Sequence, residues 1–303
     1  VFSALPAEIA QTVEWRLAET GHVVCSNASA YRMHEHVPIL LPEINAPHAA
    51  LVRVQRQKYG WGTGGLVTNS NCTSAPVAMA FAPLRPFGIV AAQLTSLQAV
   101  SGGGYPGVPS LDILDNVIPF INGEEPKLEA EPRKMLGALE GERIADLDYA
   151  ASATCTRVPV LDGHLVSVAV RFREAVSDAQ IIAAWEDFRG PEPVPSLPSA
   201  PPQPVIYHRA PDRPQPRRDR EPGTVWRRSS GGYAPARSSA AGSSWRWPTT
   251  RCAARRAARS STPNCSWPRD WWGRRRESSV FGLRFWVRGA DGRGARVAGG
   301  TPP

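Results

Sequence analysis

Residues 65–76 read Gly-Leu-Val-Thr-Asn-Ser-Asn-Cys-Thr-Ser-Ala-Pro, and much of the fold can be inferred from this segment. Its first four residues are typical of a short buried strand, and the apolar run from Ala75 to about Leu84 predicts a helix with a proline in its first turn. Cys72 lies between the two elements. Backbone N–H groups and the helix dipole at such a turn favour a thiolate, so Cys72 is a candidate covalent nucleophile with a lowered pKa. A cysteine taken alone is more often a buried packing residue.

The flanking sequence alternates between strand-like and helix-like patterns. Short apolar runs at 1–5 and 22–25 surround a helical pattern at 7–20, which predicts an α/β fold with parallel strands. The further strands that we predict lie at 39–41, 89–99, 157–160 and 165–172, and the further helices at 49–58, 110–118, 127–139 and 178–188. Residues 190–223 are proline-rich and predict an extended loop. No glycine-rich dinucleotide-binding turn opens the chain, unlike an ordinary Rossmann domain.

Several residues are candidate partners for Cys72. His164 follows an Asp-Gly turn and would act as an acid/base group if the fold brought it to Cys72, although a lone histidine is more often structural. Arg157 suits carboxylate binding, or is an ordinary surface charge. The run 101–104 would cradle phosphate or approach a nicotinamide ring, although a bare glycine run is usually a loop. The cysteines and histidines lack metal-ligand spacing, so we expect no metal.

The composition changes sharply near Gly190. Residues 1–190 contain 14 basic and 20 acidic side chains, whereas residues 191–303 contain 21 and 7, and all 21 are arginine. From Gly223 onward there is one leucine and no isoleucine, but there are seven of the ten tryptophans. So few aliphatic side chains predict a disordered segment. No apolar run reaches the roughly 18 residues of a membrane-spanning helix, and five irregularly spaced cysteines fit a reducing, cytoplasmic setting.

Several motifs in one order resemble the aspartate-semialdehyde dehydrogenase family, in the branch found in archaea, fungi and some bacteria. The resemblance runs from Val1 to about Gly223. The segments that carry it are Ser-Asn-Ala-Ser-Ala-Tyr-Arg-Met (26–33), Pro-Glu-Ile-Asn (42–45), Asn-Ser-Asn-Cys-Thr-Ser (69–74), Leu-Gln-Ala-Val-Ser-Gly-Gly-Gly-Tyr-Pro-Gly (97–107), Asp-Asn-Val-Ile-Pro-Phe-Ile (115–121), Gly-Glu-Glu-Pro-Lys (123–127) and Arg-Val-Pro-Val-Leu-Asp-Gly-His (157–164).

The resemblance implies an NADP-dependent oxidoreductase of amino-acid biosynthesis (lysine, methionine and threonine) that reduces L-aspartyl 4-phosphate to L-aspartate 4-semialdehyde. It implies that Cys72 forms a thioacyl enzyme, that His164 is the general acid/base and that Gln98 orients the acyl group. The implied substrate-binding residues are Arg157 for the α-carboxylate, Glu124 for the amino group, and Arg32 and Lys127 for phosphate. Ser101 and Gly102 would line the nicotinamide site. The implied assembly is a homodimer or homotetramer.

The resemblance also implies a domain organisation. We expect a partial Rossmann-like nucleotide-binding domain at 1–74, whose first units and phosphate-binding turn precede Val1 in the family, and an α+β catalytic and dimerisation domain at 75–222. Residues 223–303 would be an aberrant arginine-rich tail. A family-like loop and helix, written in GC-rich codons and read one base out of frame, translates as residues 249–268, so we interpret the tail as the product of a frameshift near residues 221–226.

The sequence leaves three alternatives open. The chain resembles malonyl-CoA reductases in its Cys and His arrangement, although retention of Glu124 favours an amino-acid substrate. It would otherwise be a catalytically dead fragment that serves as a dimerisation module. The arginine-rich, aromatic tail also has the composition of a nucleic-acid-binding segment, but disorder is the better explanation, so we expect no nucleic-acid and no membrane partner. As written, the chain is expected to have little or no activity.

Overall fold

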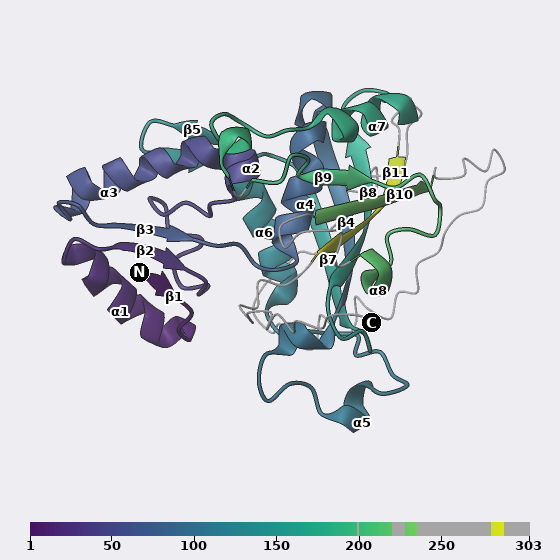
Figure 1. The fold of residues 1–303 in the computed structure, drawn as a ribbon, viewed down its shortest axis with the longest axis horizontal. Helices are drawn as coiled ribbons and strands as arrows, with labels where there is room; N and C mark the ends of the chain where they lie inside the picture. Colours follow the sequence, from purple (N-terminus) through teal and green to yellow (C-terminus); the bar gives the residue numbers. More distant parts are fainter. Residues whose placement is uncertain (199, 220–227, 235–279, 288–303) are drawn as a thin grey trace, which may run out of the picture.

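A computed structural model describes residues 1–198 and 200–219, together with the backbones of two strands at 228–234 and 280–287. The described part is built around two sheets, with helices between and outside them (Figure 1). Within the described ranges, no helix has the length and apolar character needed to cross a membrane.

The first sheet has three parallel strands in the order β1-β2-β3. The strands are β1 (Phe2–Ser3), β2 (Val23–Ser26) and β3 (Gly65–Thr68). Helix α1 (Ala7–Glu19) connects β1 to β2, and α2 (Pro42–Asn45), the 3-10 helix η1 (Ala46–Ala50) and α3 (Leu51–Tyr59) precede β3. This is the β-α-β alternation that the sequence predicts, and parallel strands need such crossover helices.

The second sheet has six strands in the order β7-β4-β8-β11-β10-β9. Its strands are β4 (Ile89–Gln98), β7 (Ala150–Arg157), β8 (His164–Phe172), β9 (Val205–Tyr207), β10 (Arg228–Ala234) and β11 (Val280–Val287). The central strand β4 pairs in parallel with β7 and antiparallel with β8. The carboxyl ends of β4 and β7 therefore lie at the same edge as the amino end of β8.

The remaining elements surround this sheet. They are α4 (Ser74–Phe81), η2 (Ala82–Phe87), η3 (Val100–Gly103), α5 (Ser110–Ile113), α6 (Glu124–Met135), the hairpin β5 (Ala138–Glu140) and β6 (Arg143–Ala145), α7 (Asp178–Asp187), η4 (Val194–Ser196) and α8 (Pro216–Asp219). Helices α4 and α6 lie between the two sheets, and α5 lies on an arm that extends away from them (Figure 1).

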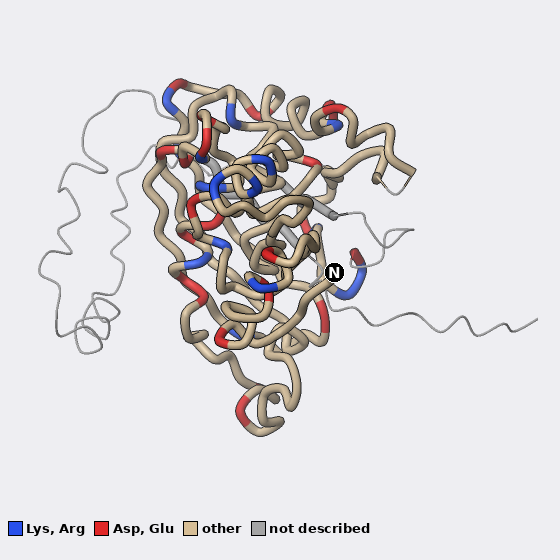
Figure 2. Tube along the Cα trace, turned by 90° about the vertical axis from the view of Figure 1, so that its left-hand side faces the viewer, with Lys and Arg blue, Asp and Glu red and all other residues tan. Residues whose placement is uncertain are grey.

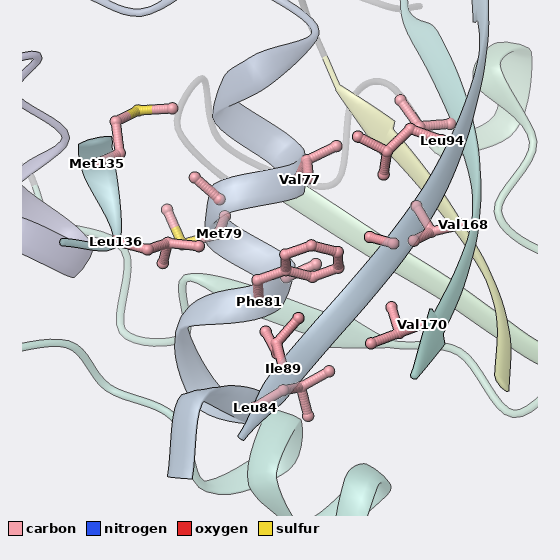
Figure 3. Packing of buried hydrophobic residues seen from close by; sticks show 14 of the residues in the cluster. Val77, Met79, Phe81, Leu84, Ile89, Leu94, Met135, Leu136, Val168 and Val170 are labelled. Atoms are coloured by element: carbon pink, nitrogen blue, oxygen red, sulfur yellow. The ribbon is translucent and has the colours of Figure 1, made fainter. Parts of the chain in front are cut away.

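The main core lies where α4 packs on the six-stranded sheet. Every residue of α4 is buried, which explains its continuously apolar sequence. Phe81 and Val77 of this helix face Leu94 of β4 and Val168 of β8 (Figure 3). The tight packing holds α4 in place, and with it the turn that precedes α4.

Some predicted elements differ from the structure. The helix expected at 110–118 ends at Ile113, because Leu114 is extended and Asp115 has a φ of 54°. The strand expected at 39–41 is reduced to a single bridge between Ile39 and Thr68. The strand expected at 157–160 lies at 150–157, where small and polar side chains pack beneath α6 and give little apolar signal.

The C-terminal third was expected to be disordered after residue 222. Most of that segment lies outside the described residues, including the stretch 249–268 on which the frameshift interpretation rests. Its described parts, β10 and β11, form strands, and β11 pairs with β8 along eight residues. Along the rest of the described chain, basic and acidic side chains are interspersed over the molecule (Figure 2). Residues 1–190 contain 14 of the former and 20 of the latter.

Candidate active site

Cys72 lies in the turn between β3 and α4. Asn71 shapes this turn, because its Oδ1 accepts the backbone N–H groups of Thr73 at 2.8 Å and Ser74 at 3.2 Å. These are donors at the start of a helix that lack partners within the helix itself. The side chain of Asn71 thus fixes the path of the chain on both sides of the sulfur.

His164 is the first residue of β8, and its side chain is fully buried. Its Nε2 lies 3.1 Å from Cys72 Sγ. Its Nδ1 accepts the backbone N–H of Ala99 at 3.1 Å. Gly163, with a φ of 97°, turns the chain into the strand, a conformation that favours glycine. The structure thus brings together a cysteine and a histidine that lie 92 positions apart in the sequence.

The expected lowering of the Cys72 pKa is wrong. Burial raises the pKa of the thiol to about 11, and the Glu124 carboxylate acts in the same direction. Thr73, Arg32 and Arg157 have the opposite effect but do not outweigh it. Loss of water is the largest cause, because burial penalises the charged thiolate. At neutral pH Cys72 is therefore a thiol, which must lose its proton when it attacks a substrate.

Glu124, the first residue of α6, is the centre of a polar cluster beside Cys72. Its carboxylate accepts hydrogen bonds from Asn71 Nδ2 at 2.9 Å, from Lys127 Nζ at 2.9 Å and from Gln98 Nε2 at 3.3 Å. Burial alone would raise the pKa of Glu124, but the hydrogen bonds and charge of Lys127, with the amides of Asn71 and Gln98, hold it below its ordinary value. Glu124 is thus a charged carboxylate whose partner Lys127 is itself only half-buried.

Gln98 and Arg157 lie opposite each other at the ends of β4 and β7. Both side chains are largely buried, at 1% and 7% exposure. The guanidinium of Arg157 donates from Nη1 to the carbonyl of Ala99 at 2.8 Å, and burial lowers its pKa. Arg157 and Gln98 therefore reach the same edge of the sheet as His164.

Gly102 allows the loop after β4 to approach these groups closely. A Cβ atom at this position would lie 2.8 Å from Arg157 Nη1 and 2.8 Å from His164 Cε1. Such distances are too short for a real side chain, so any residue other than glycine at this position would displace Arg157 or His164. Ser101, its neighbour in η3, is held by a 3.1 Å hydrogen bond from its N–H to the carbonyl of Leu161.

Arg32 is joined to the site through a residue that the sequence did not single out. Its Nη1 donates to Glu131 Oε1 at 3.1 Å, and both side chains are almost fully buried. The second oxygen of Glu131 accepts the backbone N–H of Asn71 at 2.6 Å. Burial raises the pKa of Glu131 despite the charge of Arg32. Arg32 and Lys127, both expected to bind phosphate, are therefore each paired with a carboxylate in this structure.

A signal for Glu131 was present in the sequence. Glu124, Lys127, Glu131 and Lys134 follow one another at intervals of three or four residues, which places them on one face of a helix. Lys134 is buried at the end of this face and donates to the carbonyls of Arg32, His34 and Val37, each at 2.7 Å. Buried charges are unusual on a structural helix, and here Glu124 and Glu131 contact Asn71 in the nucleophile turn.

The arrangement supports covalent chemistry on an anionic acyl substrate. A thiol lies against an imidazole, and two guanidinium groups act on it electrostatically from Arg32 and Arg157. Such groups stabilise negative charge on a substrate and on a departing anion, while the sulfur forms a covalent adduct. Among the described residues, no cluster of His, Cys, Asp and Glu side chains has the form of a metal site.

Comparison with known proteins points to one family. Residues 1–52 match the family described as "Semialdehyde dehydrogenase, NAD binding domain", and residues 81–225 match "Semialdehyde dehydrogenase, dimerisation domain". An aspartate-semialdehyde dehydrogenase from Archaeoglobus fulgidus is 50% identical over 223 residues, which cover 74% of this chain and 64% of the relative. One from Aspergillus fumigatus is 42% identical over 228 residues, which cover 73% of this chain and 63% of the relative. The chain thus spans slightly less than two thirds of the length of these relatives.

A solved structure extends the comparison to three dimensions. The aspartate-semialdehyde dehydrogenase from Candida albicans, determined with NADP, has a TM-score of 0.73 and 30% sequence identity. The match covers 95% of this chain and 72% of that one. The archaeal and fungal relatives confirm the resemblance read from the motifs.

Proposed function

The chain belongs to the aspartate-semialdehyde dehydrogenase family, and we propose that it reduces L-aspartyl 4-phosphate to L-aspartate 4-semialdehyde and phosphate through a thioacyl intermediate on Cys72. The observation that carries the proposal is the 3.1 Å contact between Cys72 Sγ and His164 Nε2, surrounded by Arg32, Arg157 and Glu124. A buried thiol beside an imidazole has the chemistry needed for covalent acyl transfer.

The first half of the reaction transfers the acyl group to sulfur. A bond forms between Cys72 Sγ and the acyl carbon, and the bond from that carbon to the phosphate oxygen breaks. The phosphate leaves with the electron pair of the broken bond, and the thiol proton ends on the released hydrogen phosphate. His164 lies at the distance needed for a proton or hydrogen-bond partner of the sulfur.

The substrate would be held by the charged groups around the sulfur. We assign the α-carboxylate to Arg157, since a guanidinium binds a carboxylate with two hydrogen bonds. We assign the amino group to Glu124, whose pKa is held low, so that it is charged at neutral pH. Gln98 would orient the acyl group, and Arg32 and Lys127 would bind the phosphate. Lys127 would then exchange its hydrogen bond to Glu124 for one to the substrate.

NADP is the cofactor that we propose, since the Candida albicans relative was determined with it. When bound, its reduced form supplies the hydride that turns the thioacyl carbon into an aldehyde carbon. The fit to this chain rests on Gly102, where a side chain would fill the space beside His164 and Arg157. We assign Gly102 and Ser101 to the nicotinamide end of the cofactor. His164 would hold a proton near the substrate oxygen, and the buried edge around Gln98 would exclude water.

We also propose how the chain is divided into domains and how it assembles. We propose domain boundaries at residues 74 and 222, the first of which falls where the chain leaves the three-stranded sheet and enters α4. A homodimer or homotetramer is proposed from the match of residues 81–225 to a dimerisation domain, and a cytoplasmic location from the cysteine usage. We also propose that turnover by this chain is low, because the segment from Gly223 onward contains one leucine and no isoleucine.

The half-reaction on Cys72 tests the proposal without the cofactor. The full chain would be incubated with L-aspartyl 4-phosphate, released phosphate would be measured, and peptides would be mapped by mass spectrometry. We expect one phosphate released per chain and an aspartyl thioester on Cys72. The Cys72→Ala variant should give neither, and Cys25→Ala, which removes a half-buried thiol of β2, should give both.

Two results would overturn the proposal. The first is a folded chain that forms no aspartyl adduct on Cys72, the outcome expected of a catalytically dead dimerisation fragment. The second is a malonyl thioester that forms from malonyl-CoA in a parallel incubation while aspartyl phosphate gives none. That result would favour the malonyl-CoA reductase alternative.

A further inference from the structure

The imidazole of His164 is held between two groups that constrain its protons. The backbone N–H of Ala99 points at Nδ1, with a donor–acceptor distance of 3.1 Å. On the other side of the ring, Nε2 lies 3.1 Å from Cys72 Sγ. A neutral imidazole has one N–H donor and one acceptor nitrogen, and the hydrogen bond made by one nitrogen determines which role the other takes.

We propose that the backbone N–H of Ala99 fixes neutral His164 as the Nε2–H tautomer, so that His164 meets the Cys72 sulfur as a hydrogen-bond donor. An N–H group can only donate, so Nδ1 must present its lone pair to Ala99, and the ring proton must then lie on Nε2. The opposite tautomer would set two N–H groups against each other across 3.1 Å. Ala99 is thus a positioning residue that acts through its peptide group.

The peptide group of Ala99 is held rigidly enough for this role. Its carbonyl accepts from Arg157 Nη1 at 2.8 Å, and its side chain is fully buried. On either side, the carbonyl of Gln98 accepts the N–H of Val158 at 2.9 Å, and the N–H of Val100 donates to Val160 at 2.8 Å. These bonds tie the end of β4 to the segment after β7, so the peptide cannot rotate its N–H away from His164.

The consequence for catalysis rests on the proposed function. A donor at Nε2 stabilises negative charge on the sulfur during attack, and then on the oxygen of the substrate carbonyl. A ring in this tautomer has no lone pair on Nε2 to take the thiol proton. In acyl transfer that proton therefore passes to the departing phosphate of the substrate, which leaves as hydrogen phosphate, and His164 keeps its own proton.

The tautomer can be observed directly and without substrate. The full chain would be labelled with ¹⁵N-histidine, and the ring nitrogens of His164 identified by their loss in the His164→Gln variant. We expect a protonated Nε2 and an unprotonated Nδ1 at a pH where the ring is neutral. A protonated Nδ1 would overturn the proposal. Because no reaction is involved, this readout stays valid even if the thioester of the proposed function never forms.

A change in the backbone tests the role of Ala99 itself. Incorporation of lactic acid in place of Ala99 replaces the N–H by an ester oxygen and leaves the methyl group unchanged. We expect the His164 signals to move towards the Nδ1–H tautomer and kcat for thioester formation to fall about 10²-fold or more, as for other lost transition-state donors, with KM little changed. The matched control is lactic acid in place of Ala10 of α1, which removes a backbone hydrogen bond to the carbonyl of Pro6 at 2.9 Å and should leave the tautomer as it is. An Ala99 ester with an unchanged His164 spectrum would refute the inference.

Discussion

The carboxylate of Glu131 accepts a 2.6 Å hydrogen bond from the backbone N–H of Asn71, the residue before Cys72. The same carboxylate pairs with Arg32 at 3.1 Å. One buried side chain of α6 therefore holds both the turn that carries the nucleophile and one of the proposed phosphate-binding residues. A short charge-assisted hydrogen bond of this kind is among the stronger polar contacts in proteins.

Replacement of Glu131 by glutamine should destabilise the chain. The Glu131→Gln variant leaves the Arg32 guanidinium buried without its counter-charge, and loss of one partner of a buried pair costs about 3–5 kcal/mol. Urea unfolding measures this as a lower free energy of unfolding. The exposed Glu140→Gln variant is the control and should change that free energy by less than about 0.5 kcal/mol. Equal stabilities for the two variants would contradict the structural role of Glu131.

Loss of the Glu124 carboxylate should make Cys72 more reactive. Burial is the larger cause of its raised pKa, and the charge of Glu124 is the second. In the Glu124→Gln variant the thiol pKa falls below about 11, so that a larger fraction is thiolate at any pH below that value. Alkylation of Cys72 by iodoacetamide, followed against pH, should show a midpoint shifted to lower pH. The exposed Glu142→Gln variant should keep the original midpoint, and an unchanged midpoint for Glu124→Gln would rule this electrostatic effect out.

A methyl group at residue 102 should damage the site more than the fold. The Cβ of the Gly102→Ala variant would displace Arg157 Nη1 or the His164 ring. Displacement of reacting groups by about 1 Å can cost about 10²-fold in rate. We therefore expect kcat/KM for thioester formation on Cys72 to fall by that order, with little change in the urea midpoint. In the Gly103→Ala control the new Cβ meets only Val108, at 3.4 Å. Equal rates for the two variants would argue against a crowded site at Gly102.

The stability of the chain should depend on pH through Lys134. Burial lowers the pKa of this lysine to about 8, from an ordinary value of 10.5. Between those values the unfolded chain binds a proton that the folded chain has lost, so the free energy of unfolding gains a contribution that rises with pH, by at most about 1.4 kcal/mol per unit. The Lys134→Met variant should lack this contribution and should also lose about 1–3 kcal/mol, because three buried carbonyls lose their donor. Parallel pH dependences of wild type and variant would contradict the prediction.

The sequence was most informative where local pattern and tertiary structure agree. The strand at 65–68 and the strands that begin near Ile89 and His164 have apolar runs bounded by turns, and the structure has strands there. The helix from Asp178 begins after Ser177, which forms a capping box with Gln180, a local signal that needs no tertiary context. Motif order also identified the family, because several short segments in sequence are more specific than any one of them.

The parts that could not be predicted depend on contacts between distant segments. The raised pKa of Cys72 follows from burial under α6 and from Glu124, 52 positions away in the chain. The helical spacing of Glu131 could be read from the sequence, but its partners Arg32 and Asn71 could not, because they come from loops far from α6 in the sequence. The strand at 150–157 was missed because its alanines, serine and threonines owe their place to α6 above them and to β4 beside them.

The antiparallel pairing of β4 with β8 places His164 beside the backbone of Ala99. Leu97 is opposite Leu165 in the last pair of the ladder, two residues before Ala99 and one residue after His164, and the irregularity between Ile89 and Ala91 lies at the opposite end. A slip of two residues between these strands would carry the imidazole about 7 Å along the sheet, out of reach of the sulfur. The ladder therefore fixes the position of the His164 ring relative to the backbone N–H of Ala99, and its change of register lies at the end of the strands far from the site.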